Sequence, residues 1–228
     1  MMVLVALIVG LARAAVADDL KLAANPDLPL AARQAAWGRM LSPELVKDLV
    51  KLANQPEISR NERWVAIRAL GPIQDDRARE ELLQYLASDD ASTRMAALGA
   101  LGDRGDRQLS GRVAGSLADK ALIVRASAAD ALAHLKDPST LADLDRALAD
   151  PTNSYRGASM WVRHRFVAAM AAIGTDAAVP PLARALDDAD PLVVDAAVTG
   201  LETVAGFSYD QGRTPDEEKE AWRRWAGR

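Results

Sequence analysis

Residues 63–71 read RWVAIRALG, and residues 94–102 read RMAALGALG. Both stretches begin with Arg and then place Ala at +3, an apolar residue at +4, Ala at +6, Leu at +7 and Gly at +8. Arg125 begins a third copy, and Arg33 begins an earlier and weaker one. Self-similarity at a period of about 31 residues is the signature of a stack of repeated structural units. The repeat therefore decides the fold.

The repeat continues towards the C-terminus without its Arg. Two later copies begin at Phe166 and Val194. Each second half carries a pair of apolar residues four apart: Leu82 and Leu86, Val113 and Leu117, Leu144 and Leu148, and Leu182 and Leu186. Spacings of three and four residues indicate one apolar stripe per helix. Each repeat is therefore predicted to be a pair of helices.

Turn residues fall between the predicted helices. An Asp stands near the start of each second helix, where it can cap free N–H groups, at Asp76, Asp106, Asp137 and Asp176. Glycines are predicted to end the first helices at Gly71, Gly102 and Gly174. The small residues at +3 and +6 should let neighbouring repeats approach closely. The repeated Arg and the turn Asp are predicted to pair between neighbouring repeats as a ladder.

Composition agrees with a helical chain. The 228 residues include 46 Ala and 29 Leu, whereas aromatic residues make up only 4%. Ala and Leu are the best helix formers, so the composition argues against an all-β fold. The absence of Cys excludes disulfides and thiolate zinc sites. A formal net charge of −4 argues against a nucleic-acid partner, which usually needs a basic footprint.

The Arg-x-x-Ala-Ala-x-Ala-Leu-Gly blocks and the Leu-x-x-x-Leu-x-Asp endings resemble the HEAT-like repeats of bacteria, including the phycobilisome-lyase type. The resemblance covers about residues 27–228. It implies an all-α, right-handed α-solenoid of about five to six two-helix repeats, whose second helices line a concave face. We expect the solenoid over residues 18–206.

Residues 207–228 are predicted to form a C-terminal cap. Thr214 and Glu217 make a capping box, with Pro215 at the first helical position. Trp222 and Trp225 lie three apart on one face of this helix, and we expect them to cover the last repeat together with Phe207 and Tyr209. A Trp pair that serves as a ligand platform is the alternative.

The first 17 residues have the pattern of a signal peptide. An uncharged apolar stretch leads into Ala15-Val16-Ala17, which has the small residues of a cleavage site. We therefore expect a periplasmic or secreted protein with no stable membrane insertion after cleavage. The alternative is an apolar first helix that docks on the fold of a cytoplasmic protein.

Motifs that carry chemistry are few. No Gly-rich phosphate loop, HExxH motif or EF-hand pattern occurs. Some HEAT-like enzymes bind iron through His-Glu pairs, but here Leu135 follows His134 and Arg165 follows His164. No metal or cofactor is therefore expected. A Ser-His-Asp arrangement stays open from the sequence alone.

One break in the period stands out. From Arg125 to Phe166 the step is about ten residues longer than usual, and residues 152–166 hold three Arg and no acidic residue. Insertions in repeat arrays map to loops, often on a binding face, and Tyr, Trp and Arg are enriched at interface hot spots. The candidate partner contacts of this insertion are Tyr155, Arg156, Trp161, Arg163 and Arg165. The alternative is a lengthened first helix whose Trp161 packs inward.

The leading hypothesis is a non-catalytic scaffold that binds another protein, possibly one with an acidic surface, on the concave face and the insertion. Further candidate contacts face outward on the second helices and are mixed in sign: Glu81, Gln84, Arg112, Arg146 and Arg184. The alternative is an enzyme or enzyme subunit such as a bilin lyase, because the repeats resemble those of the phycobilisome-lyase type.

Overall fold

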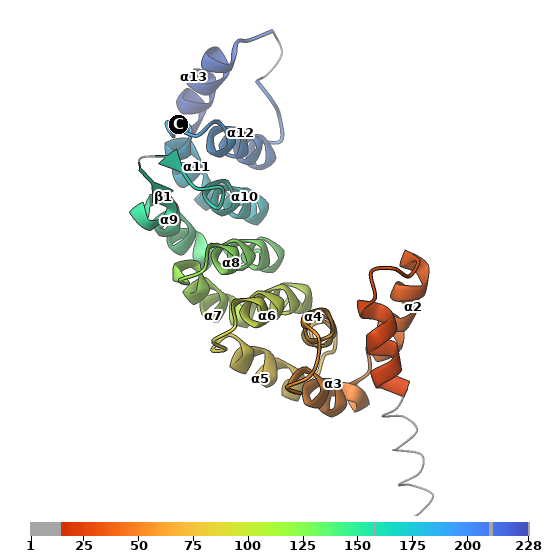
Figure 1. Cartoon of the computed structure of the whole chain (residues 1–228). Helices are drawn as coiled ribbons and strands as arrows, with labels where there is room; N and C mark the ends of the chain where they lie inside the picture. The colour runs from red at the N-terminus through yellow and green to blue at the C-terminus, as the bar shows by residue number, and fades with distance from the viewer. Residues whose placement is uncertain (1–14, 157, 210–211, 228) are drawn as a thin grey trace, which may run out of the picture. The chain divides into compact units, whose positions relative to one another are not determined.

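The computed structural model describes residues 15–156, 158–209 and 212–227 (Figure 1). The chain is an all-α solenoid of two-helix repeats, interrupted by one short hairpin. It divides into two compact units, one ending at Arg104 and the other beginning at Gly105. No helix in the described part of the chain is long and apolar enough to cross a membrane.

The first unit begins with a helical segment over residues 15–24. The predicted signal peptide lies mostly outside the described residues; its last three residues open this helix, in which Val16 and Leu20 are buried. The helices that follow are α2 (Leu30–Met40), the 3-10 turn η1 (Pro43–Leu45), α3 (Val46–Ala53), α4 (Arg60–Ala69), α5 (Asp76–Tyr85) and α6 (Ala91–Arg104). In this unit α4 packs against α3 and α6, and α5 packs against α6.

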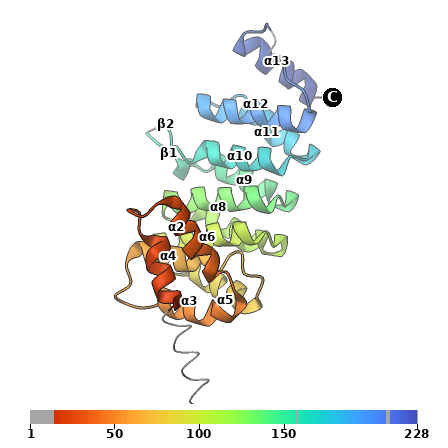
Figure 2. The same ribbon diagram turned by 90° about the vertical axis from the view of Figure 1, so that its right-hand side faces the viewer.

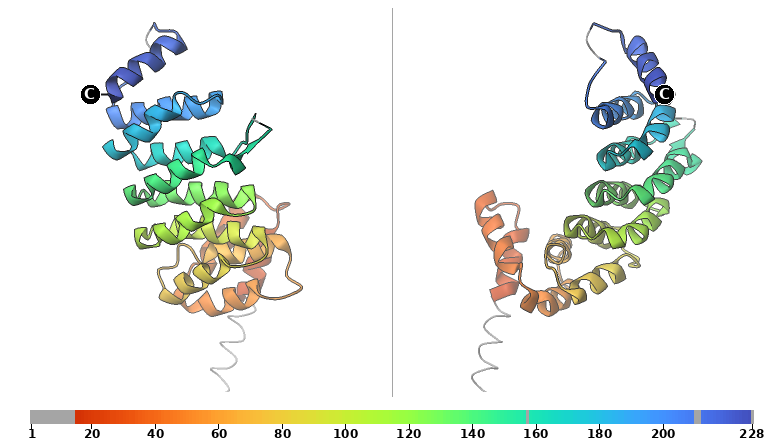
Figure 3. Two further views of the ribbon diagram at one scale, coloured as in Figure 1. Left: turned by 90° about the vertical axis from the view of Figure 1, so that its left-hand side faces the viewer. Right: turned by 180° about the vertical axis from the view of Figure 1, so that it is seen from behind.

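The second unit continues the alternation of first and second helices. Its elements are η2 (Arg107–Leu109), α7 (Ser110–Ala114), η3 (Gly115–Ala118), α8 (Leu122–Leu135), η4 (Pro138–Thr140), α9 (Leu141–Ala149), η5 (Pro151–Asn153), β1 (Ser154–Tyr155), β2 (Ala158–Ser159), α10 (Arg163–Ile173), η6 (Asp176–Ala178), α11 (Val179–Ala185), α12 (Pro191–Ala205) and α13 (Pro215–Ala226). The first helices α8, α10 and α12 lie side by side in one layer (Figure 2). The second helices α7, α9 and α11 form the other layer, which faces the viewer in the left panel of Figure 3.

Small residues bring neighbouring first helices close together, as the sequence predicts. Ala128, Ala169 and Ala197 at +3 are almost fully buried. A Cβ atom on Gly200 at +6 would lie 2.9 Å from the Cβ atom of Ala171 in α10 and from both terminal methyls of Leu182 in α11. Glycine is therefore required where α12 crosses its neighbours.

The capping residues agree with the predictions only in part. Asp106 and Asp137 each accept a backbone N–H two residues on. In the first unit the cap is Asp75, not Asp76, because Asp75 has the extended backbone that lets its carboxylate reach the N–H of Arg77. At η6 the N-cap is Thr175 rather than Asp176, and its side chain makes no capping hydrogen bond.

The glycines differ in role. Gly174 ends α10 in the left-handed conformation, with φ of 65°, as predicted. Gly102 does not end its helix, because α6 runs on to Arg104, followed by Gly105 with φ of 71°. Gly71 is needed for close approach instead: a Cβ atom there would lie 2.5 Å from the carbonyl oxygen of Ala100.

The predicted Arg–Asp ladder does not hold at Arg63. Arg63 donates to the carbonyl oxygens of Ala53 and Gln55, each at 3.0 Å. Arg94 likewise donates to the carbonyl oxygens of Ser88 and Asp89. The last carbonyls of a helix lack intrahelical partners, so a long guanidinium that reaches back from the next helix satisfies them. The repeated Arg therefore ties each first helix to the end of the preceding second helix.

The capping box predicted near the C-terminus is present. Thr214 and Glu217 form the capping box of α13. Trp222 is fully buried and stacks on Phe207, with ring centroids 5.5 Å apart, and it meets Tyr209 and Trp225 edge-on. This cluster supports a packing role for the Trp pair rather than a ligand platform.

Candidate functional site

The insertion forms a hairpin, not an extension of the first helix. Strands β1 and β2 pair antiparallel, with Ser154 opposite Ser159 and Tyr155 opposite Ala158. The two-residue connection begins with Arg156, whose φ is 51°. A left-handed first residue is the geometry that two-residue hairpins favour, because its twist matches that of the strands. The extra residues therefore project at the start of α10 (Figure 2).

A buried asparagine fixes the base of the hairpin. Asn153 is almost fully buried and donates from Nδ2 to the carbonyl oxygen of Ala147 at 2.8 Å. Its Oδ1 accepts a hydrogen bond of 2.6 Å from Nη1 of Arg125, the repeat Arg of α8. Its carbonyl oxygen accepts from the N–H of Met160, the residue after β2. Asn153 thus anchors the base of the hairpin to α8 and α9 and ties its two ends together.

The aromatic side chains of the insertion face solvent. Tyr155 is 60% exposed and Trp161 is 46% exposed. The guanidinium of Arg156 lies over the ring of Tyr155, 5.2 Å from its centroid. The alternative, a lengthened first helix whose Trp161 packs inward, does not hold, because Trp161 lies in the turn before α10 and the buried residues there are Val162, the N-cap, and Phe166.

Two more exposed apolar residues lie along the same edge. Ile123 is in the first turn of α8 and Leu192 is in the first turn of α12, on either side of Trp161 in the stack. Together, Ile123, Tyr155, Trp161 and Leu192 are called the edge row below. Exposed apolar side chains on one edge of a stack are candidates for an interaction site.

The other two arginines of the insertion pair within the chain. Arg163 is only 15% exposed at its side chain and forms an ion pair with Asp188, which is 11% exposed. Arg165 forms an ion pair of 3.1 Å with Asp130 of α8, and both side chains are exposed. Arg163 therefore stabilises the fold, whereas Arg165 stays at the surface and is paired with Asp130.

The candidate residues on the second helices fall in both units. Glu81, which is half-buried, and Gln84, which is exposed, lie on α5 of the first unit. Arg112, Arg146 and Arg184 are exposed on α7, α9 and α11 of the second unit. Arg184 pairs with Asp145 at 2.6 Å, and Arg146 pairs with Asp143 at 2.6 Å.

The second helices also enclose a shallow hollow. It measures about 300 Å³ between α7 and α9, with Ala114, Leu117 and Ala147 in its lining and Asp143 and Arg146 beside them. Within the described ranges, no group of three or more His, Cys, Asp or Glu residues could hold a metal ion.

Sequence reasoning missed the residues that hold the insertion in place. Neither the anchoring role of Asn153 nor the pairing of Arg163 with Asp188 was expected. One signal was available: Asp150-Pro151 repeats the Asp-Pro pattern of Asp137-Pro138, and Asp150 caps η5 by accepting the N–H of Thr152 at 2.7 Å. That hydrogen bond holds the pKa of Asp150 below its usual range.

Comparison with known proteins agrees with this architecture. The profile of HEAT repeats matches residues 46–120 and 79–162, which together span more than half of the chain. The profile of the PBS lyase HEAT-like repeat matches residues 162–188. No protein of curated function shows significant sequence similarity to the chain.

Solved structures share the fold. The complex of CpcE and CpcF of phycocyanin lyase from Nostoc sp. PCC7120 contains a chain that is 20% identical, with a TM-score of 0.58. The alignment covers 71% of this chain and 65% of that one. Kap121p is 14% identical with a TM-score of 0.55, over 84% of this chain but only 25% of Kap121p. The chain thus spans less than two thirds of the length of either protein.

Proposed function

The chain belongs to the HEAT-repeat family, and from this premise we propose that it is a non-catalytic scaffold that binds another protein through its hairpin and the edge row. The observation that carries the proposal is the exposure of Tyr155 and Trp161 on a rigidly anchored insertion. Loops on a rigid framework are where binding residues concentrate. Aromatic side chains that lose their solvent on binding supply much of the energy of an interface.

Charge gives a second reason and suggests the kind of partner. Arg156 is exposed at the tip of the hairpin in a chain of net charge −4, whereas Arg165 is already paired with Asp130. A local basic surface on an acidic protein favours encounter with an acidic surface of the partner. The outward residues Arg112, Arg146 and Arg184 on the second helices extend the proposed contact to a second face of the same unit.

An enzyme subunit of the bilin-lyase type is the second candidate. The match of residues 162–188 to the PBS lyase HEAT-like repeat favours it, and the match includes the helix that follows the hairpin. On this reading the chain would assist attachment of a pigment to a protein. Incubation of the purified chain with a bilin and apo-phycobiliprotein would test it, because covalently bound pigment is visible after denaturing electrophoresis.

The scaffold proposal is tested by capture from an extract of the native source. The wild type, Tyr155→Ala/Trp161→Ala and the control Leu30→Ala are each used as bait. Leu30 is 65% exposed on α2 of the other unit, so its loss removes a similar apolar surface elsewhere. We expect a protein that the wild type and the control retain and the double variant loses. If every protein retained by the wild type is also retained by the double variant, the hairpin is not the binding site.

We also propose that the protein is exported and that cleavage follows Ala17. Sequencing the N-terminus of protein made from the full native gene tests this directly. A mature protein that begins at Asp18 would support export, and one that begins upstream would count against the site. The helix over residues 15–24 would then start at Asp18, and it would keep Asp19, which accepts two hydrogen bonds from Nε and Nη2 of Arg39.

A further inference from the structure

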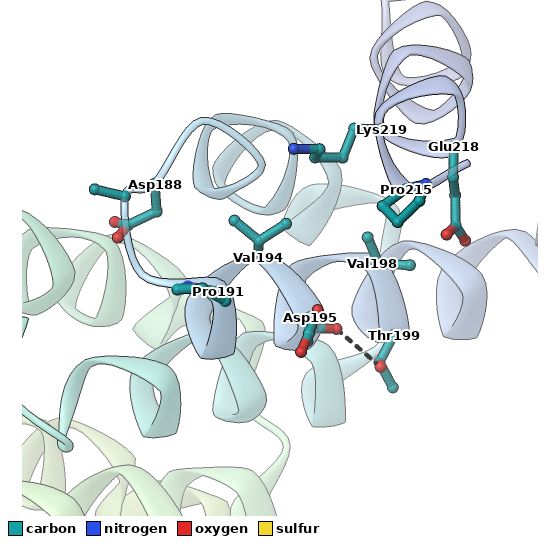
Figure 4. A pocket seen from close by; sticks show the side chains of 10 residues that line it. Asp188, Pro191, Val194, Asp195, Val198, Thr199, Pro215, Glu218 and Lys219 are labelled. Carbon is teal, nitrogen blue, oxygen red and sulfur yellow. Dashed lines mark hydrogen bonds between the residues drawn. The ribbon is translucent and has the colours of Figure 1, made fainter. Parts of the chain in front are cut away.

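A hollow of about 480 Å³ lies between α12 and α13 (Figure 4), and the ion-paired Asp188 is one of its lining residues. Val194 and Val198 of α12 point into it, and Pro215 and Lys219 of α13 lie on its opposite side. Asp195 and Glu218 stand at its rim. The hollow therefore combines an aliphatic floor with carboxylates at its margin.

The far half of α13 is anchored to the stack. Trp222 is fully buried, and Arg223 forms an ion pair of 2.5 Å with Asp187 just after α11. In the near half, Lys219 pairs with Asp216 of its own helix rather than with α12. The first turns of α13 consequently stand off the two valines of α12.

The same face of the preceding first helix is fully covered. In α10, Phe166, Val167 and Met170 are fully buried and Ala171 nearly so. That face points at α12, because the Cβ atom of Ala171 lies against Gly200.

By the repeat register, Val194, Asp195, Val198 and Thr199 hold these positions in α12. Asp195 and Thr199 are exposed there, and both valines are half-exposed. The open face of α12 is therefore the surface on which another first helix would pack. A polar end face alone would keep the end of a stack soluble, but it would not need two valines side by side.

Within the chain, one pair of neighbouring first helices is already joined by an ion pair. Asp130 of α8 pairs with Arg165 of α10 across two adjacent first helices. Thr199 holds the position of Asp130 in α12, and Asp195 lies one turn before it. Among the described residues, the carboxylates of Asp195 and Glu218 have no ion pair of their own, so an approaching helix with a basic side chain would meet two free acids.

We infer that this hollow docks an amphipathic helix of another protein, one that presents two aliphatic side chains four residues apart and a Lys or Arg beside them. The incoming helix packs as a further first helix of the stack, with its aliphatic pair on Val194 and Val198 and its cation beside Asp195. The site goes beyond the proposed function, because it recognises a basic helix rather than an acidic surface.

The test uses the full chain and a display library of short helical peptides with one randomised face. We expect enriched peptides to carry the aliphatic pair and a Lys or Arg. Their affinity should fall at least tenfold on Asp195→Lys and on Val198→Asp. The control Asp176→Lys makes the same change of charge at an exposed residue of η6 and should leave the affinity unchanged.

Circular dichroism melts identify any variant that unfolds; the exposed Asp195→Lys still decides the question if Val198→Asp does not fold. Three results would overturn the inference. The first is a library that yields no binder. The second is a set of binders that ignore Asp195→Lys and Val198→Asp. The third is self-association of the chain in analytical ultracentrifugation that disappears with Asp195→Lys, which would assign the face to a second copy of the chain.

Discussion

Arg163 donates through Nη1 and Nη2 to the two carboxylate oxygens of Asp188, at 2.9 and 2.6 Å. The two residues belong to consecutive repeats, and Nε of Arg163 also lies 3.4 Å from the carbonyl oxygen of Leu148. One guanidinium thus joins the end of α9, the start of α10 and the turn before α12. A two-pronged pair of this geometry is among the stronger polar contacts in proteins.

Asp188→Ala should therefore destabilise the second unit. Because the pair is shielded from solvent, loss of the carboxylate leaves a partly buried cation without its partner, and we expect a cost of about 2–3 kcal/mol. The matched control is Asp145→Ala, which breaks the pair with Arg184. The side chains of Arg184 and Asp145 are 61% and 35% exposed, so loss of their ion pair should cost less than about 1 kcal/mol. Urea melts measure both, and equal losses would contradict the role given to Arg163.

Gly71→Ala should destabilise the first unit. The new methyl group would lie 2.5 Å from the carbonyl oxygen of Ala100 and 2.9 Å from its Cα atom, and backbone cannot move aside as a flexible side chain can. We expect a loss of about 1–3 kcal/mol. In Gly38→Ala the methyl group meets nothing within 4 Å inside α2, so helix propensity should stabilise the fold by about 0.5–1 kcal/mol. Opposite shifts in the urea midpoint would bear out this difference; a Gly71→Ala variant as stable as the wild type would contradict it.

The fold could be predicted because the residues that determine it recur at a regular spacing. Ala at +3 recurs in every copy, and a small residue at +6 recurs in every copy except the weak first one at Arg33. Each repeat packs against a neighbour of the same kind, and Gly200 shows how little room such packing leaves. The partners of the repeated Arg could not be predicted in the same way. Backbone carbonyls such as that of Ala53 leave no trace in the sequence, whereas a recurring Asp is visible and invites the wrong pairing. The sequence likewise could not show that Asp75 rather than Asp76 caps α5. The choice depends on the extended backbone of Asp75, which two adjacent acids do not reveal.

The candidate site was predictable in position but not in form. The extra residues between Arg125 and Phe166 are apparent from the sequence, and so is their aromatic and basic content. The hairpin depends on Asn153, whose burial follows from contacts with α8 and α9 rather than from any local pattern. Arg163 is held in an ion pair because it meets Asp188, which lies 25 residues away, and no sequence motif connects the two residues.

Tyr85 should make stability depend on pH in the alkaline range. Burial raises the pKa of Tyr85 to about 12, the nearby Glu81 carboxylate adds to the shift, and Asn54 and Arg63 oppose it. In the unfolded chain the phenol ionises near its ordinary pKa of 10, while the folded protein still holds it neutral. Above pH 10 the unfolded state therefore binds fewer protons, and stability falls as the pH rises towards 12.

Tyr85→Phe isolates this contribution. Between pH 8 and pH 11 the wild type should lose about 1 kcal/mol more than the variant, which has no proton to release at this position. Urea melts of both proteins at the two pH values give the difference. Other groups titrate equally in the two proteins, so they cancel. A variant that loses as much stability as the wild type would show that Tyr85 ionises normally in the folded state.

The exposed charge of the hairpin should control how salt affects partner binding. Arg156→Asn removes the cation but keeps a residue that tolerates the positive φ of this position. If Arg156 lies at the rim of an interface with an acidic protein, the affinity for the captured partner should fall about threefold to fivefold in low salt, on the order of 1 kcal/mol. The loss should shrink as salt rises, because screening removes the same attraction from the wild type.

Arg213→Asn is the control for net charge. Arg213 is also exposed and also lies over a tyrosine ring, that of Tyr209, 5.2 Å from its centroid. It belongs to the C-terminal cap, so its loss should leave binding at the hairpin unchanged at every salt concentration. Titrations of both variants between low and high salt separate a local effect from a global one. Parallel salt curves for Arg156→Asn and the wild type would mean that the partner does not meet the tip of the hairpin with an acidic surface.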